Sequence, residues 1–322
     1  MNPARLFRSQ ILLAAVALIA VAALAACGSN GNDESASASK TANASASAGS
    51  DTSCPNGKLR FGVEPYEDAS KLTPAYEAVG AALSKKLGCP VDVQIVQTYA
   101  AEVLAMQNDK LDVAEFGPLG FVFANKRANA QPLASFGTAD GKLSTYTAGI
   151  WVPKDSQIKT LADLKGKSLA LSETGSTSGD GLPRYALTQA GLNPERDVKL
   201  KYAGGHPESM LALTHGKVDA AEVNSQQQHT AMSEHLFDPG KFRQIWKSDP
   251  IPSDPVTVRG SLPKAFQDKV KEALLSLPPS TLKQIGDLLD FNPPGNMQAV
   301  STSTYKPLFD LADALHLTEK DV

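Results

Sequence analysis

Residues 91–116, VDVQIVQTYAAEVLAMQNDKLDVAEF, decide the fold class. Residues 91–96 alternate between apolar and polar side chains, which predicts a strand. Residues 100–110 then predict a helix, and the largely apolar residues 111–116 predict a second strand. Strands that are separated by a helix of this length usually lie parallel in one sheet, so this stretch favours an α/β fold.

The alternation extends toward the N-terminus. Residues 58–63 predict a strand, and a helix follows for which Thr73 is the expected N-cap and Pro74 the first helical residue. Gly88 is expected to end that helix, because glycine readily adopts the left-handed conformation found after a helix. The segment therefore predicts the order βαβαβ, which implies a parallel sheet covered by helices.

A second α/β unit begins near residue 148, and the chain crosses between the units near residues 147 and 254. Its expected strands alternate with helices and lie at residues 149–153, 168–171, 198–202, 218–223 and 242–246. Residues 255–259 again look extended, and residues 262–322 predict mainly helix. We therefore predict two lobes around a cleft, with residues 57–147 and 255–322 as lobe 1 and residues 148–254 as lobe 2.

The N-terminus indicates export. Arg5 and Arg8 precede an apolar run over residues 11–26, which suits the core of a signal peptide and is short for a membrane span. The run ends in Leu-Ala-Ala-Cys-Gly, which resembles a bacterial lipobox, so residues 1–26 are the expected signal peptide and Cys27 the expected lipidation site. An ordinary cleavage site beside an incidental cysteine is the alternative. Residues 27–56, rich in Ser, Ala and Gly, predict a disordered tether.

Charge and cysteine content limit the remaining function classes. The 31 Lys and Arg residues against 34 Asp and Glu give a net charge of −3, which argues against a dedicated nucleic-acid binder. Cys54 and Cys89 each precede an expected strand. If these strands are parallel neighbours, the two thiols lie at one sheet edge, and a disulfide between them is plausible outside the cytoplasm. Free thiols are the alternative.

The segment GSTSG at residues 175–179 follows an expected strand and opens an expected helix. The hydroxyls of Ser176, Thr177 and Ser178, together with the free N–H groups of a helix N-terminus, form an anion site that needs no Arg or Lys. A capping residue within a polar loop is the alternative. The segment is neither a phosphate-binding Walker loop nor a nucleophile elbow.

Four further polar residues are candidates for the cleft. His206 lies at the start of an expected helix, where its imidazole can donate to an oxyanion or cap the helix. Asp254 lies at the second crossover, where it can accept a hydrogen bond from a protonated ligand oxygen or cap a turn. Tyr99 and Tyr146 are cleft candidates by position, although a place in the core is the ordinary expectation for each.

Metal binding and catalysis are not expected. The spacings of His206, His215, His229 and His235 match no ligand pair on one helical face, so we expect no metal and no cofactor. The chain carries the residue types of a serine hydrolase without a nucleophile signature, so we expect it not to be an enzyme.

Residues 61–259 resemble the substrate-binding lipoproteins of phosphate, phosphite and phosphonate ABC importers. The resemblance is carried jointly by several short segments in order: Phe61-Gly62-Val63, Tyr99-Ala100, Asp112-Val113-Ala114, Gly117-Pro118, Val152-Pro153-Lys154-Asp155-Ser156, Ser176-Thr177-Ser178-Gly179, His206, Gly216-Lys217-Val218-Asp219-Ala220-Ala221, Ile251-Pro252-Ser253-Asp254-Pro255 and Val258-Arg259. It implies a type II periplasmic-binding-protein fold, in which two α/β lobes close by a hinge on a ligand in the cleft.

The resemblance also implies roles for individual residues. Ser176, Thr177 and Ser178 hold the oxyanion with backbone N–H groups, while Tyr99, Tyr146 and His206 add donors and Asp254 contacts the ligand from the hinge side. In aminoethylphosphonate binders a Glu twenty residues after the His pairs with the ligand ammonium. Here that position is Gln226, which is neutral, so a ligand with an uncharged tail is favoured.

The expected function is binding of phosphite, methylphosphonate or a related phosphonate and its delivery to a membrane permease. We expect a monomer that is held to the extracytoplasmic side of the cell membrane, or the cell surface, by its lipid anchor. The alternatives are the same fold with another small ligand such as a sulfonate, and an extracytoplasmic hydrolase.

Overall fold

The computed structural model describes residues 53–317, which lie within one compact unit. The predicted signal peptide, the lipidation site Cys27 and most of the predicted tether lie outside the described residues.

The first sheet has six strands in the order β13-β4-β12-β3-β1-β2. Their bounds are β1 (Leu59–Val63), β2 (Val91–Ile95), β3 (Val113–Glu115), β4 (Gln131–Ser135), β12 (Val256–Val258) and β13 (Gln298–Ala299). Strand β1 is parallel to both β2 and β3, which confirms the predicted βαβαβ order. Strand β12 runs antiparallel to β3 and β4, and β13 runs antiparallel to β4.

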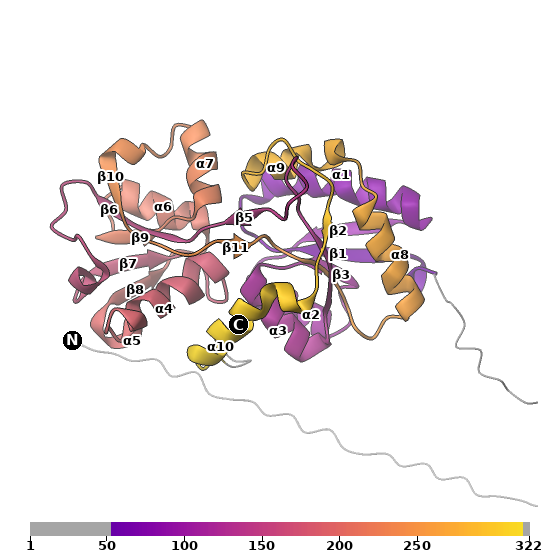
Figure 1. Ribbon diagram of the computed structural model, residues 1–322, viewed down its shortest axis with the longest axis horizontal. Helices are drawn as coiled ribbons and strands as arrows, with labels where there is room; N and C mark the ends of the chain where they lie inside the picture. The colour runs from indigo at the N-terminus through magenta and orange to yellow at the C-terminus, as the bar shows by residue number, and fades with distance from the viewer. Residues whose placement is uncertain (1–52, 318–322) are drawn as a thin grey trace, which may run out of the picture. The chain divides into compact units, whose positions relative to one another are not determined.

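Helices cover both faces of this sheet (Figure 1). One core contains side chains of β1 with those of α1 (Ala69–Leu87), α8 (Lys264–Leu275) and α9 (Lys283–Leu288). The other core lies on the opposite face and contains side chains of α2 (Tyr99–Gln107), α3 (Pro118–Ala128) and α10 (Lys306–Ala314). The sheet is therefore the middle layer of three, and its strand ends are the places left for polar residues.

Two sequence-based expectations for this half are wrong in detail. Helix α1 begins at Ala69 and contains Pro74, because the backbone N–H groups of Lys71 and Leu72 already bond to the carbonyl of Asp68. In the C-terminal tail, residues 298–299 form strand β13 rather than helix, because they pair with β4.

The second sheet has five strands in the order β10-β6-β9-β7-β8. Their bounds are β6 (Gly149–Pro153), β7 (Ser168–Leu171), β8 (Lys199–Tyr202), β9 (Ala220–Glu222) and β10 (Phe242–Lys247). Strand β7 is parallel to β8 and β9, and β6 is antiparallel to β9. Helix α4 (Leu182–Gln189) contributes to the core on one face, and α6 (His206–Thr214) and α7 (Ser225–Ser233) contribute to the core on the other. The short helix α5 (Pro194–Asp197) precedes β8.

The chain passes between the two sheets through a pair of short strands. Strand β5 (Thr145–Tyr146) pairs antiparallel with β11 (Ile251–Pro252), and the two lie between the sheets in Figure 1. Every strand of the first sheet comes from residues 59–135 or 256–299, and every strand of the second from residues 149–247. The two proposed lobes follow this division of the strands.

Short helical turns complete the described chain. They are η1 (Pro55–Gly57), η2 (Leu161–Leu164), η3 (Thr177–Gly181), η4 (Pro239–Lys241), η5 (Pro279–Leu282) and η6 (Thr302–Tyr305).

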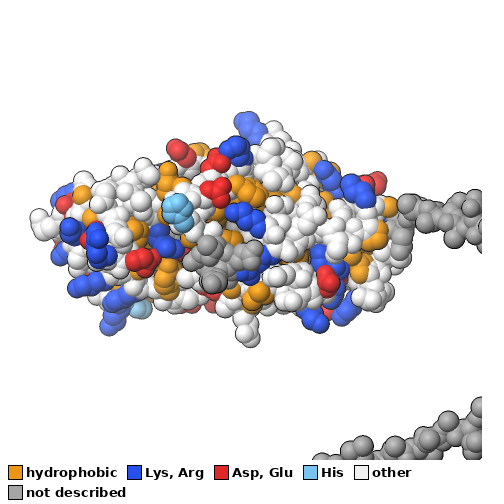
Figure 2. Space-filling model, turned by 90° about the horizontal axis from the view of Figure 1, so that it is seen from below, with side chains coloured by type: hydrophobic (Ala, Val, Ile, Leu, Met, Phe, Trp, Pro, Cys, Tyr) orange, Lys and Arg blue, Asp and Glu red, His pale blue; other side chains and the backbone are white. Residues whose placement is uncertain are grey.

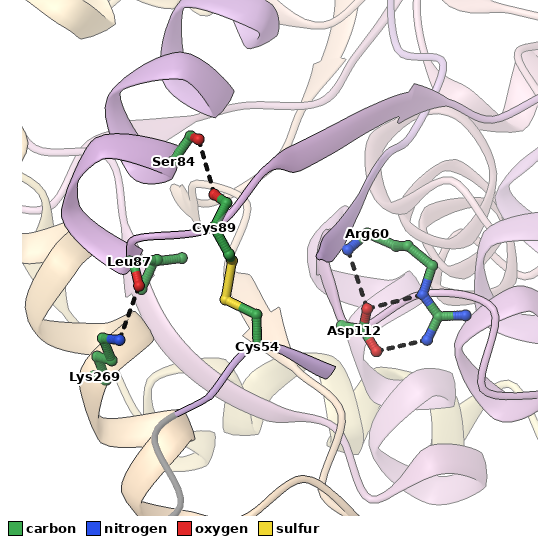
Figure 3. Close-up of a disulfide and its surroundings, with 7 residues drawn as sticks. All are labelled: Cys54, Arg60, Ser84, Leu87, Cys89, Asp112 and Lys269. Atoms are coloured by element: carbon green, nitrogen blue, oxygen red, sulfur yellow. Dashed lines mark hydrogen bonds and ion pairs between the residues drawn. A yellow bond between two sulfur atoms is a disulfide. The ribbon is translucent and has the colours of Figure 1, made fainter. Parts of the chain in front are cut away.

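A disulfide joins Cys54 to Cys89 at one end of the first sheet (Figure 3). The two residues precede β1 and β2, which pair in register, and their Cα atoms are 6.4 Å apart, within the range that a disulfide spans. Next to it, Ser84 Oγ donates to the carbonyl of Cys89 at 2.8 Å. The start of the described chain is thus fastened to the end of α1.

The surface gives no indication of a nucleic-acid partner on the face in Figure 2. Lys and Arg side chains there are spread among acidic, apolar and neutral polar ones rather than gathered in one patch. None of the helices between residues 53 and 317 combines the length and apolar character that crossing a bilayer requires.

Candidate ligand-binding site

One small cavity lies between the two halves of the molecule. Residues at strand ends and at helix starts from both halves line it. All eight predicted binding residues line it. The lining residues are Glu64, Tyr66, Glu67, Tyr99, Gly117, Tyr146, Ser176, Thr177, Ser178, His206, Asn224, Gln226, Gln227, Asp254 and Leu288. The cavity volume is about 20 Å³. One water needs about 10–15 Å³, so the cavity is small and admits only a small ligand.

The loop after β7 forms one wall of the cavity. Ser176 is the N-cap of η3, and its Oγ accepts a hydrogen bond from the N–H of Gly179 at 3.2 Å. The helix that residues 175–179 were expected to open is not regular at its start, because η3 is a π-helical turn and α4 begins only at Leu182. A Cβ atom at Gly179 would lie 1.8 Å from Ser172 Oγ, so only glycine fits there. Such π turns are frequent at functional sites.

Thr177 connects this loop to the first sheet. The N–H of Leu119, in the first turn of α3, donates to Thr177 Oγ1 at 2.8 Å, and both groups are buried. This N–H therefore holds the two halves together and is not directed at a ligand. The phenols of Tyr99 and Tyr146 face the same loop. Burial raises the pKa of both hydroxyls well above the usual value, so both remain protonated and able to donate.

His206 supplies the cavity's imidazole, which a buried carboxyl holds in place. It is the first residue of α6, and its Nδ1 lies 2.8 Å from Glu222 Oε1, while its Nε2 lies 3.2 Å from Ser176 Oγ. Burial lowers the pKa of His206, but the charge and hydrogen bond of Glu222 outweigh it and raise the pKa overall. Asn224 Nδ2 is 3.3 Å from His206 Nδ1 and donates to Ser178 Oγ at 3.2 Å. Among the described residues that line the cavity, none is Lys or Arg.

Carboxyl groups form the opposite wall. Asp254 follows β11, and burial raises its pKa to about 7, although contacts with Glu115 and His206 reduce the shift. Glu64, directly after β1, is buried and lines the cavity. Burial and the neighbouring acidic groups also raise the pKa of Glu64, Glu102 and Glu115 well above the usual range.

Sequence reasoning did not identify Glu64 or Glu115 as site residues. The signal that could have found them is their position, because they end or follow two adjacent parallel strands, with Val63 paired to Glu115. In α/β sheets, ligands bind at the carboxyl ends of the strands. Glu67 and Asn224 were missed as well; both lie in loops that follow strands.

Gln226 lies in the first turn of α7 and contacts the other half of the molecule. Its Nε2 donates to the carbonyl of Leu289 at 3.2 Å, just after α9. Thr230 Oγ1 donates to the carbonyl of Leu288 at 3.4 Å. The neutral amide of Gln226 therefore lines the cavity and bridges its two sides. Between residues 53 and 317, no group of three or more His, Cys, Asp or Glu side chains is arranged to hold a metal ion.

Two α/β units, a pair of crossing strands between them and a polar cavity at their junction define a type II periplasmic-binding-protein fold. Over residues 61–308 the chain matches the family described as "ABC transporter, phosphonate, periplasmic substrate-binding protein". The chain belongs to this family. Its members are substrate-binding components of transporters, in agreement with the prediction that the chain is not an enzyme, and their periplasmic location indicates an extracytoplasmic protein.

Two curated relatives show how far the similarity extends. The phosphonates-binding periplasmic protein of Escherichia coli is 31% identical over 225 residues, which are 68% of this chain and 65% of the relative. The phosphate-import protein PhnD of Mycolicibacterium smegmatis is 29% identical over 217 residues, which are 64% of this chain and 68% of the relative. The chain thus spans about two thirds of the length of each.

Solved structures share the fold. The structure of PhnD1 from Prochlorococcus marinus in complex with methylphosphonate has a TM-score of 0.71 and 21% identity, and covers 82% of this chain and 100% of that protein's chain. The binding-protein component of an ABC phosphonate transporter from Pseudomonas aeruginosa has a TM-score of 0.69 and 24% identity, with 79% and 85% covered.

Proposed function

We propose that the chain is the substrate-binding component of an ABC importer and delivers a small phosphorus oxyanion to a membrane permease. Phosphite, methylphosphonate and related phosphonates are the favoured ligands. The observation that carries the proposal is the donor set of the cavity: three consecutive hydroxyl residues, three phenols and one imidazole held by a buried carboxyl. The names of the E. coli and M. smegmatis relatives, which refer to phosphonates and phosphate, support the ligand class.

In this proposal the oxyanion is bound mainly by uncharged dipoles. Backbone N–H groups and hydroxyls of residues 176–178 hold its oxygens, and Tyr99 and Tyr146 add donors from the other side of the cavity. His206 adds a donor on an imidazole whose pKa Glu222 raises, and Asp254 contacts the ligand from the hinge side. Donors from both halves converge on one ligand, so the ligand stabilises the arrangement in which the halves are in contact.

The N-terminal features complete the proposal. We expect residues 1–26 to be removed as a signal peptide, Cys27 to carry the lipid and residues 27–56 to tether the binding domain to the membrane. Mass spectrometry of membrane fractions tests this. Diacylglycerol on Cys27, and a Cys27→Ala variant that leaves the membrane fraction, are expected; an unmodified Cys27 would contradict the anchor.

Calorimetry with phosphite, methylphosphonate, aminoethylphosphonate, phosphate and methanesulfonate tests the ligand class. Wild-type protein should bind a phosphorus oxyanion more tightly than the sulfonate and release it chemically unchanged. Hydrogen bonds to charged groups contribute about 1.5–3 kcal/mol each, so a Ser176→Ala, Ser178→Ala double variant should bind at least about a hundredfold more weakly. Ser276→Ala, on the surface beyond α8, is the matched control. Tighter sulfonate binding, product formation or unchanged affinity in the double variant would refute the proposal.

A further inference from the structure

Glu64 lines the cavity, and one of its carboxyl oxygens has no hydrogen-bond partner among the described residues. Its side chain is buried, with 3% of the residue exposed, and lines the cavity. The N–H of Gly117 bonds to this carboxylate, and a Cβ atom at Gly117 would lie 2.7 Å from Glu64 Oε1. Glu64 Oε2 has no hydrogen-bond partner among the described residues. A buried polar atom of this kind needs a partner, and the cavity is the place from which one can come.

The groups around Glu64 are mostly acidic. Asp254 from the second crossover, Glu102 from α2 and Glu173 from the loop after β7 act on it electrostatically, and Glu64 in turn acts on Glu115 from β3. The phenols of Tyr66, Tyr99 and Tyr146 also face it. Among the described residues that line the cavity, the basic group is the imidazole of His206, which is paired with Glu222. Several carboxylates cannot all be ionised in one buried site, so some hold protons at neutral pH.

We propose that Glu64 is a specificity-determining residue whose protonated carboxyl donates a hydrogen bond to an oxygen of the bound anion. The inference rests on the proposed function and goes beyond it by naming the ionisation state of the ligand that the cavity selects. A protonated carboxyl is a donor, so it pairs with a fully ionised phosphorus oxyanion, whose oxygens only accept. A ligand with an ammonium tail needs an ionised Glu64 instead.

The proposal fixes the sign of the pH dependence. As pH rises, Glu64 loses its proton, the donor disappears and a negative charge faces the anion. Affinity for a ligand that is already fully ionised therefore falls with rising pH, by up to tenfold per pH unit for each proton that the complex must hold. Loss of a proton from His206 or Asp254 also lowers the affinity as pH rises. Variants of Glu64 are therefore needed to identify its part of the pH dependence.

Calorimetry with methylphosphonate and phosphite from pH 6 to 9, in pairs of buffers with different ionisation enthalpies, tests the proposal. The ionisation of each free ligand is measured separately, and the measured affinities are corrected for it. Glu64→Gln keeps a donor of the same shape that does not titrate. The affinity of this variant should be within about threefold of that of wild type at pH 6.5. The variant should take up one proton fewer than wild type on binding, and its affinity should fall less steeply as pH rises. Glu208→Gln, an exposed carboxyl that does not line the cavity, should keep the wild-type slope.

A second variant covers the case in which Glu64→Gln folds poorly. Glu64→Leu removes the donor and the charge, so its affinity should be at least tenfold below wild type at pH 6.5, with the difference shrinking or reversing at pH 9. An unchanged pH slope in both variants would overturn the inference while leaving the proposed function intact. The inference would also be overturned if the wild type bound aminoethylphosphonate most tightly of all the ligands and both variants lost this binding. Glu64 would then be ionised. Absence of binding to every phosphorus compound would overturn both proposals.

Discussion

Replacement of Glu222 by glutamine removes the charge that raises the pKa of His206. Glu222 ends β9, its side chain is fully buried, and its Oε1 lies 2.8 Å from His206 Nδ1. Glutamine has the same shape and keeps an oxygen that accepts from Nδ1. The substitution therefore changes the charge of the pair and leaves the position of the imidazole in place. Burial then lowers the pKa of His206, because the opposing effect of the carboxylate is gone.

The expected loss of affinity follows from the hydrogen bond on the other ring nitrogen. His206 Nε2 faces the cavity wall, 3.2 Å from Ser176 Oγ. A hydrogen bond from a charged donor contributes about 1.5–3 kcal/mol, and one from a neutral donor about 0.5–1.5 kcal/mol. The difference is about 1–1.5 kcal/mol, so the Glu222→Gln variant should bind phosphite about tenfold more weakly at pH 7.5.

Two assays together test this prediction. Calorimetry gives the affinity ratio between wild type and variant, and the chemical shifts of the imidazole nitrogens give the protonation state of His206. At pH 7.5 His206 should be protonated in wild type and neutral in the variant. The affinity ratio should fall toward one as the pH is lowered, because the imidazole of the variant then gains its proton as well.

The matched control is Glu208→Gln, an exposed carboxyl in the first turn of the same helix as His206. It removes the same charge without touching the imidazole and should change the affinity less than twofold. The reasoning fails if the wild-type imidazole is neutral at pH 7.5, or if both variants weaken binding equally.

Three further predictions concern stability and the contact between the halves. Cys89→Ser opens a loop of 35 residues, so denaturant unfolding should show a loss of about 2–4 kcal/mol with phosphite affinity unchanged; equal stability would contradict a disulfide to Cys54. Lys71 and Glu234 form an ion pair of 2.7 Å between α1 and the end of α7, and such exposed pairs contribute about 0–1 kcal/mol. Lys71→Ala should therefore weaken binding up to about fivefold at low salt and less at high salt, and a salt-independent loss would argue against an electrostatic contact. Asp254 keeps its proton in the folded state up to a pKa of about 7, whereas the unfolded chain loses it near 3.8. The free energy of unfolding should thus fall as pH rises from 4 to 7, by about 1.4 kcal/mol per pH unit for this proton, and Asp254→Asn should flatten the fall; an unchanged slope in the variant would mean that Asp254 is ionised when folded.

The sequence predicts most of the fold because local signals and the sheet agree. The strand patterns at residues 59–63, 91–95 and 168–171 are each followed by a helix or a turn signal, and the structure has strands at these positions. The start of α1 was misplaced because the carbonyl of Asp68 nucleates an additional turn before Pro74.

The parts of the candidate site that belong to a short motif were predictable from the sequence. The parts formed by strand ends that are distant in the sequence were not. Ser176 and His206 each open a helical turn, which a single sequence reveals. Glu64, Glu102 and Glu115 lie inside apolar patterns, and nothing local distinguishes a buried carboxyl from a solvent-facing one. Their mutual approach depends on the strand order β3-β1-β2, which is a property of the assembled sheet.

A crystal structure with methylphosphonate bound tests most directly whether uncharged donors between the two halves bind the anion. The account predicts phosphonate oxygens within hydrogen-bond distance of the backbone N–H groups and hydroxyls of residues 176–178 and of Tyr99 and Tyr146, with no Lys or Arg side chain in contact. Ligand bound elsewhere, or held by a Lys or Arg side chain that moves into the cavity, would contradict it.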